Sequence, residues 1–104
     1  MIECQIKERK EDYVALQLRG ELANQFWTDS LRCALQDHFV DAGVKFIRID
    51  LSGVSFLDNY GIATLVALQR ESRERGKELT VEGPTGQARE KLRVTGVSKV
   101  LHKE

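Results

Sequence analysis

The chain has 104 residues, of which 41% are hydrophobic and 31% charged, as expected for one soluble domain with one core. Sixteen basic residues balance sixteen acidic ones, so the chain has no general attraction to nucleic acid or to an anionic membrane. The longest apolar run, Ile62 to Leu68, is far shorter than the roughly 20 residues of a spanning helix. The charged N-terminus of the chain also lacks the apolar core of a signal peptide, so we expect a cytoplasmic protein without membrane insertion.

Two strands are predicted at the start of the chain. Apolar and polar residues alternate from Ile2 to Ile6, and the extended pattern resumes from Tyr13 to Leu18 after the charged turn 10–12. An antiparallel pair is the simplest interpretation. Cys4 in the first strand and Cys33 in the helix predicted next lack CxxC spacing, and we expect both to be reduced packing residues; a disulfide between them is the alternative.

A first helix is predicted after Gly20, with Asn24 or Thr28 as its N-cap and Gly43 at its end. Its apolar residues recur at helical spacing and are Trp27, Leu31, Ala34, Leu35, Phe39 and Ala42. A buried strand is predicted to follow from Phe46 to Leu51, where apolar residues again alternate with polar ones.

The second half of the chain repeats the alternation of helix and strand. A helix is predicted from Tyr60 to Arg75, with Gly76 as its left-handed C-cap, and a short strand follows at 79–81. A further helix runs from the Thr85 cap to Arg93, and a short helical turn at 97–101 closes the chain. The pattern predicts a single α/β domain over residues 1–104, with a mixed sheet of about four strands packed with about four helices.

The junction at Asp58 to Ile62, where a polar loop is expected to join the central strand to its helix, is the most informative part of the chain. The unpaired backbone N–H groups and the dipole of a helix N-terminus favour a phosphate or a carboxylate there. Because the buried stripe of the helix begins only at Ile62, Tyr60 is expected to project from the surface. The alternative is that its ring folds back over the core.

No residue pattern indicates an active site. His38 and His102 stand alone, so no metal site is expected, and Gly53, Gly61 and Gly83 are interpreted as separate turn glycines rather than as a phosphate-binding loop. Asp50 lies at the end of the predicted strand and Asp58 at the start of the helix, and acidic residues at such positions are usually structural. We therefore expect no catalytic residue and no cofactor, and a protein that is not an enzyme.

Six short motifs, in order and spread over nearly the whole chain, resemble the STAS domain family, typified by bacterial anti-sigma factor antagonists. They are Gly20-Glu21-Leu22, Asp50-Leu51-Ser52-Gly53-Val54, Phe56-Leu57-Asp58 with Gly61, Arg75-Gly76, Gly83-Pro84 and Leu92-Arg93-Val94-Thr95-Gly96-Val97. The resemblance implies partner switching: the antagonist binds an anti-sigma factor that is also a serine kinase, and phosphorylation of a serine at the helix start breaks the complex.

This chain departs from the family pattern at the switch itself. Tyr60 occupies the position of the usual phosphoserine, Asn59 that of the serine before it, and Ala23 that of the acidic residue after the Gly-Glu-Leu turn. We therefore expect a protein-binding module that contacts its partner through the segment Asp58, Asn59, Tyr60, Gly61 and Ile62 and the helix up to residue 75, without the serine switch.

Two alternatives follow from the same resemblance. In the first, phosphorylation occurs at another hydroxyl group near the junction, with Ser52, Ser55 and Thr64 as the acceptors available, although Thr64 lies within the helix and the two serines precede Asp58. A different role is that of an accessory STAS subunit in an ABC-type lipid-transport complex of the membrane. Genes for a kinase, phosphatase or sigma factor nearby would favour signalling, and genes for an ATP-binding cassette and a permease would favour transport.

Overall fold

The computed structural model describes residues 2–96, without the side chains of residues 25–28. Seven elements follow one another: β1 (Ile2–Lys10), β2 (Tyr13–Leu22), α1 (Asn24–Val40), β3 (Phe46–Leu57), α2 (Asn59–Glu74), β4 (Glu78–Glu82) and α3 (Gly86–Thr95). The terminal turn expected at 97–101 and His102 lie outside the described residues. The predicted α/β class is confirmed, with a mixed sheet of four strands and three helices in the described part.

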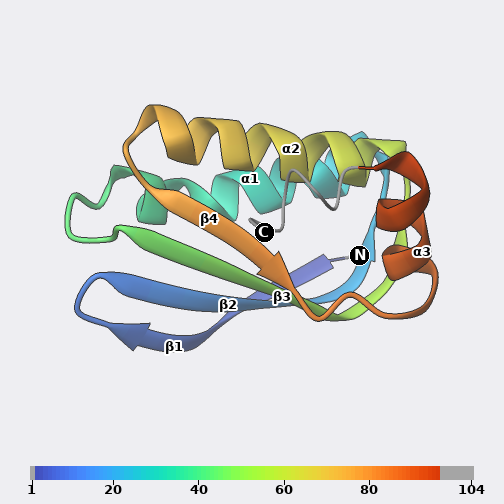
Figure 1. Cartoon of the computed structure of the whole chain (residues 1–104), viewed down its shortest axis with the longest axis horizontal. Coiled ribbons are helices and arrows are strands. Elements are labelled where there is room, and N and C mark those ends of the chain that lie inside the picture. The colour runs from blue at the N-terminus through green and yellow to red at the C-terminus, as the bar shows by residue number, and fades with distance from the viewer. Residues whose placement is uncertain (1, 97–104) are drawn as a thin grey trace.

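The strands lie side by side in chain order, β1-β2-β3-β4 (Figure 1). β1 and β2 form the predicted antiparallel pair, whereas β2 with β3 and β3 with β4 are parallel. Each parallel pair needs a crossover connection, which α1 and α2 supply. Both helices pack against the same face of the sheet, and α3 lies at one end of it beside β3 (Figure 1).

The core lies between the sheet and the helix pair α1 and α2. Alternate residues of the strands and one stripe of each helix are fully buried there, as their spacing predicts. Members of this core are Val14, Leu16, Leu18, Ile47, Ile49, Leu51, Leu79 and Val81 from the strands, and Leu31, Leu35, Phe39, Leu65 and Leu68 from the helices. Ala34 and Ala42, predicted on the same stripe, are exposed instead. Trp27 is also predicted on this stripe, but its side chain is not among those that the structure describes.

β3 is longer than predicted. The sequence predicts its end at Leu51 and interprets Gly53 as a turn glycine, but the strand continues to Leu57, and the β2–β3 register shifts beside Gly53. A Cβ atom on Gly53 would lie 2.8 Å from the carbonyl oxygen of Leu18, so this glycine serves a close approach of two strands rather than a turn. Strand and helix are therefore joined by Asp58 alone, and the expected polar loop is wrong.

The C-terminal end of α1 is tied to the start of β4 by a lysine. The buried ammonium of Lys77 donates hydrogen bonds to the carbonyl oxygens of Asp41 at 2.7 Å and Val44 at 2.5 Å. A positive charge is favoured at this end of a helix dipole, and here it satisfies carbonyl groups that have no partner inside the helix. Gly76, immediately before it, has φ +72, which confirms the predicted left-handed position after α2.

The two cysteines are free thiols in different surroundings. Cys4 is half-buried against the core, and burial raises the pKa of its thiol. Cys33 is exposed, because it lies on the side of α1 that faces away from the sheet. The prediction of a packing role therefore holds for Cys4 and is wrong for Cys33.

Candidate functional site

The start of α2 lies beside the start of α1, because the parallel strands β2 and β3 end at the same edge of the sheet. We call Asp58–Ile62 the junction segment. Asp58 is the single residue between β3 and α2, and the remaining four residues form the first turn of the helix. The N-termini of two helices thus meet at this edge, each with backbone N–H groups that need acceptors.

One carboxylate serves both helices. Oδ1 of Asp58 accepts a hydrogen bond from the backbone N–H of Gly61 at 2.9 Å, and Oδ2 accepts one from the backbone N–H of Asn24 at 2.9 Å. The first bond is an N-cap within α2, and the second reaches the first residue of α1. The anion that the helix starts favour is therefore a side chain of the protein itself.

The predicted N-cap of α1, Asn24 or Thr28, is wrong. Neither Asn24 nor Thr28 occupies the N-cap position, which belongs to Ala23, a residue without a side-chain acceptor. Asn24 is instead the first helical residue, with a left-handed φ of 57°. Asp58, 34 residues away in the chain, supplies the acceptor that the local sequence lacks.

The junction segment has a buried half and an exposed half. Gly61 and Ile62 are buried, whereas Asn59 is exposed and the Tyr60 residue exposes 56% of its surface. Tyr60 thus projects from the surface, as the start of the buried stripe predicts, and the alternative of a ring folded over the core is wrong. Phe56, two residues before Asp58, is a second exposed aromatic residue, 41% exposed, which sequence reasoning did not single out.

The other hydroxyl groups differ in access. Thr64 is buried on the inner side of α2, with only 7% of its surface exposed. Ser52 and Ser55 are exposed, and the Ser55 hydroxyl donates to the carbonyl oxygen of Gly20 at 3.3 Å. Only the two serines before the junction are therefore open to another protein.

A residue of α3 holds the end of β3. The backbone N–H of Leu57 donates to Oε1 of Gln87 at 2.8 Å, and Nε2 of Gln87 donates to the carbonyl oxygen of Leu57 at 2.9 Å. Both polar groups of the residue before Asp58 are thereby paired with one side chain. Sequence reasoning missed Gln87, because a polar residue near the start of a short helix carries no local signal for such a contact.

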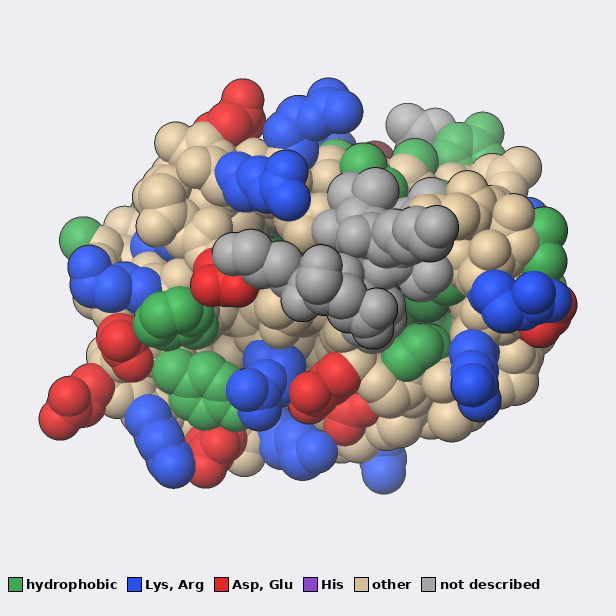
Figure 2. Space-filling view, viewed as in Figure 1, with side chains coloured by type: hydrophobic (Ala, Val, Ile, Leu, Met, Phe, Trp, Pro, Cys, Tyr) green, Lys and Arg blue, Asp and Glu red, His purple; other side chains and the backbone are tan. Residues whose placement is uncertain are grey.

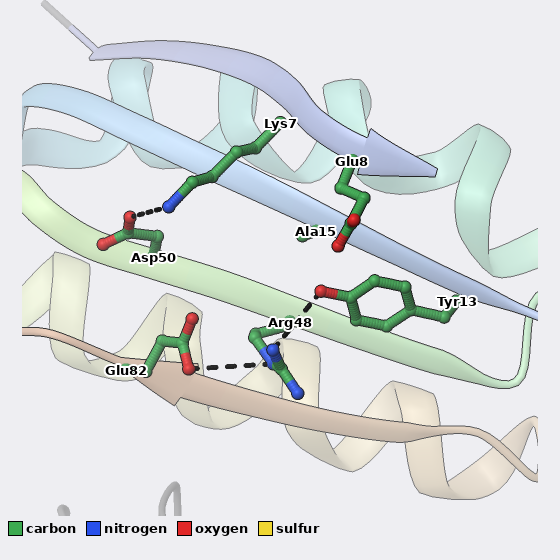
Figure 3. Close-up of a pocket in the computed structure, with 7 residues that line it drawn as sticks. All are labelled: Lys7, Glu8, Tyr13, Ala15, Arg48, Asp50 and Glu82. Atoms are coloured by element: carbon green, nitrogen blue, oxygen red, sulfur yellow. Dashed lines mark hydrogen bonds and ion pairs between the residues drawn. The ribbon is translucent and has the colours of Figure 1, made fainter. Parts of the chain in front are cut away.

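A hollow of about 280 Å³ lies on the sheet face opposite α1 and α2 (Figure 3). Four of its charged groups form two ion pairs: Lys7 Nζ lies 3.1 Å from Asp50 Oδ2, and Arg48 Nε lies 3.7 Å from Glu82 Oε2. Partial burial opposes ionisation of Asp50, but hydrogen bonds from Ser52 and Lys7 outweigh it and hold the pKa of this carboxyl below its ordinary value. Asp50 and Asp58 have separate partners, so they do not form a carboxylate pair.

Residues 2–96 contain no group of three His, Cys, Asp or Glu side chains placed to hold a metal ion. In the same part of the chain, no helix has the length and apolarity needed to cross a membrane. Acidic and basic side chains are interspersed over the face seen in Figure 2, without a large area of one sign. The junction segment offers an exposed aromatic residue, Tyr60, on a backbone that the hydrogen bonds of Asp58 hold in place.

Similar proteins share this architecture. The family model described as "Mlab, STAS domain" matches residues 6–102. The chain is 29% identical over 100 residues to the anti-sigma-B factor antagonist of Listeria monocytogenes, which covers 96% of this chain and 86% of that protein. An anti-sigma factor antagonist from Mycobacterium paratuberculosis superposes with a TM-score of 0.76 at 23% identity, over 100% of this chain and 87% of the other.

The unphosphorylated form of the anti-sigma factor antagonist SpoIIAA has the same fold, with a TM-score of 0.76 at 19% identity, over 92% of this chain and 83% of the other. The family model covers nearly all of the chain, and these structures share its mixed sheet and the helices on it. The chain therefore belongs to the STAS domain family, as an anti-sigma-factor-antagonist-like member.

Proposed function

We propose that this chain is a cytoplasmic protein-binding module without catalytic activity, which contacts an anti-sigma factor of the serine-kinase type, or a related signalling partner, through residues 58–75. The similarity over nearly the full chain to an anti-sigma-B factor antagonist supports a partner of this class. The resemblance to the family's switch motif at Asp58 to Gly61 supports a contact at the start of α2.

The observation that carries this proposal is the exposed Tyr60 ring on a fixed backbone. Tyrosine offers a large apolar surface with a polar tip, and such residues dominate the binding energy of many interfaces. Asp58 fixes the turn beneath it through bonds to Gly61 and Asn24. A surface that is already ordered loses little conformational entropy when a partner binds, so more of the contact energy appears as affinity.

The usual switch is absent from this proposed contact. Asn59 and Tyr60 offer no serine or threonine hydroxyl, and Thr64 is buried. Binding is therefore constitutive or is regulated by other means, with Ser52 and Ser55 as the remaining exposed acceptors near the junction.

Affinity purification from the native cell, followed by calorimetry with the purified partner, tests the proposal. Tyr60→Ala is expected to weaken binding by about 2 kcal/mol or more, and to leave the melting temperature unchanged. Phe46→Ala is the matched control, because Phe46 is also an exposed aromatic residue, 44% exposed, but lies at the opposite end of β3. If Tyr60→Ala binds as tightly as wild type, the junction segment is not the contact site.

A second candidate is an accessory subunit of an ABC-type lipid-transport complex. Two observations favour it: the matching family model is described as "Mlab, STAS domain", and the missing acceptor at residues 59 and 60 suits a permanent docking role. The same purification separates the two functions. Recovery of an ATP-binding-cassette protein with a permease supports transport, and recovery of a kinase-like anti-sigma factor supports signalling.

A further inference from the structure

The last part of β3 lacks a strand neighbour on one side. β4 pairs with β3 only from Phe46 to Asp50, so among the described residues Leu57 has no strand partner on that side. The carboxamide of Gln87 takes the place of one, because it presents one C=O acceptor and one N–H donor, as a peptide group does. On its other side, Leu57 pairs with Leu22 of β2.

The residues next to the Gln87–Leu57 contact connect α3 to both α1 and α2. Ala88 and Leu92 are fully buried, so α3 is fixed to the core independently of Gln87. The residue that follows Leu57 is Asp58, whose carboxylate binds the first turns of α1 and α2. A continuous path of hydrogen bonds and one peptide link therefore runs from α3 through Leu57 to the two helix N-termini.

We infer that Gln87 is a positioning residue for the junction segment: through Leu57 it holds Asp58 where one carboxylate reaches both helix starts, and so sets how Tyr60 is presented. Part of this inference, the effect on partner binding, rests on the proposed function. The structural part does not, because it concerns only the free protein. On this basis a partner or a substitution that moves α3 also alters the surface around Tyr60.

Gln87→Glu tests the inference with a change that can be reversed by pH. At neutral pH the carboxylate still accepts from the N–H of Leu57 but cannot donate to its carbonyl oxygen, and it places a negative charge beside that oxygen. A protonated glutamic acid regains the donor and mimics the amide. Gln36→Glu is the matched control, since it makes the same chemical change at an exposed position of α1.

The measurement is amide hydrogen exchange by NMR on the free protein, followed at three backbone amides: Leu57, Gly61 and Asn24. In Gln87→Glu at pH 7, all three are expected to exchange about tenfold faster than in Gln36→Glu, after correction for intrinsic rates. Near pH 4, where a glutamate protonates, the difference is expected to shrink to about twofold or less. Wild type is measured at both pH values, so that any effect of acid on the rest of the protein, including the charged groups of α3 (Arg89, Glu90, Lys91 and Arg93), is subtracted.

Two results would overturn the inference. Unchanged exchange of all three amides at pH 7 would show that the amide pair does not hold β3. Faster exchange at Leu57 alone, with Gly61 and Asn24 unaffected, would show that the bond exists but does not position the junction segment. Neither result depends on a partner, so the failure of Tyr60→Ala to weaken binding would count against the proposed function and leave this inference standing.

Discussion

Gly61 lies directly against the backbone of Leu22: a Cβ atom on Gly61 would stand 2.2 Å from the carbonyl oxygen of Leu22 and 2.6 Å from Cδ1 of Leu57. No side chain can occupy that space without moving the helix. The first turn of α2 therefore rests on the end of β2, and this contact brings the N-termini of the two helices together.

Gly61→Ala is expected to destabilise the fold by about 3 kcal/mol, because the added methyl group must push α2 away from β2. Gly76→Ala is the control: its Cβ would meet nothing within 4 Å, but its φ of +72 costs about 1–2 kcal/mol for an alanine. Urea denaturation of both variants measures the difference. A Gly61→Ala variant as stable as wild type would mean that the contact with Leu22 relaxes without cost.

Asp58→Ala is expected to cost about 2 kcal/mol of unfolding free energy, since it removes the N-cap of α2 and the acceptor for α1 together. Asp58→Asn retains one acceptor oxygen and should cost about half as much. Denaturation curves decide this, and amide exchange at Asn24 and Gly61 shows which bond the asparagine keeps. A loss below about 0.5 kcal/mol in the alanine variant would contradict the double cap.

Leu65→Ala is expected to cost about 2–5 kcal/mol, because Leu65 is fully buried between α2 and the sheet. Arg70→Ala on the exposed side of the same helix is the control, with an expected change within about 0.5 kcal/mol. Chemical denaturation measures both. A small loss at Leu65 would be incompatible with the observed placement of α2.

Stability should fall in acid partly through Asp50. Its pKa is lowered in the folded state by hydrogen bonds that outweigh its partial burial, so its carboxylate stabilises the fold above the ordinary aspartate value of about 3.9. That contribution is lost as the pH falls through the lower folded-state pKa. Denaturation of wild type and Asp50→Asn between about pH 5 and 2 should therefore converge in acid. A constant difference would exclude this titration.

Phosphorylation by a serine kinase of the anti-sigma factor type should leave the wild-type junction segment unmodified, because Asn59 and Tyr60 offer no serine or threonine. Tyr60→Ser should become an acceptor where the kinase still docks. Mass spectrometry after incubation with ATP compares the two proteins. Stoichiometric phosphate within residues 58–62 of wild type would contradict this interpretation of the substitution.

The elements with a long, regular pattern could be predicted from the sequence. The alternation in β2 and the first half of β3, and the helical stripe through Ile62 and Leu65, follow from burial on one side. The second half of β3 could not, because Ser52-Gly53 has the composition of a turn. What keeps the strand extended there is the approach of Leu18 from β2, which is a tertiary contact.

The candidate site was predictable only in part. Its position and the exposure of Tyr60 follow from where the buried stripe of α2 begins. The second bond of Asp58 and the pairing of Leu57 with Gln87 could not be predicted, because these partners lie 34 and 30 residues away in the chain. The sequence shows which side chains can donate or accept hydrogen bonds. Which partner each one finds depends on how distant elements pack together.

The strand order of the sheet also bears on how the chain folds. Each strand pairs with the one before it in sequence, so none has to be inserted between two that are already paired. The longest connection between neighbouring strands contains a single helix. The entropy lost when each strand pairs with the previous one is therefore limited. The hairpin β1–β2 can therefore serve as the template on which a nascent chain adds its strands one at a time, in the order of synthesis.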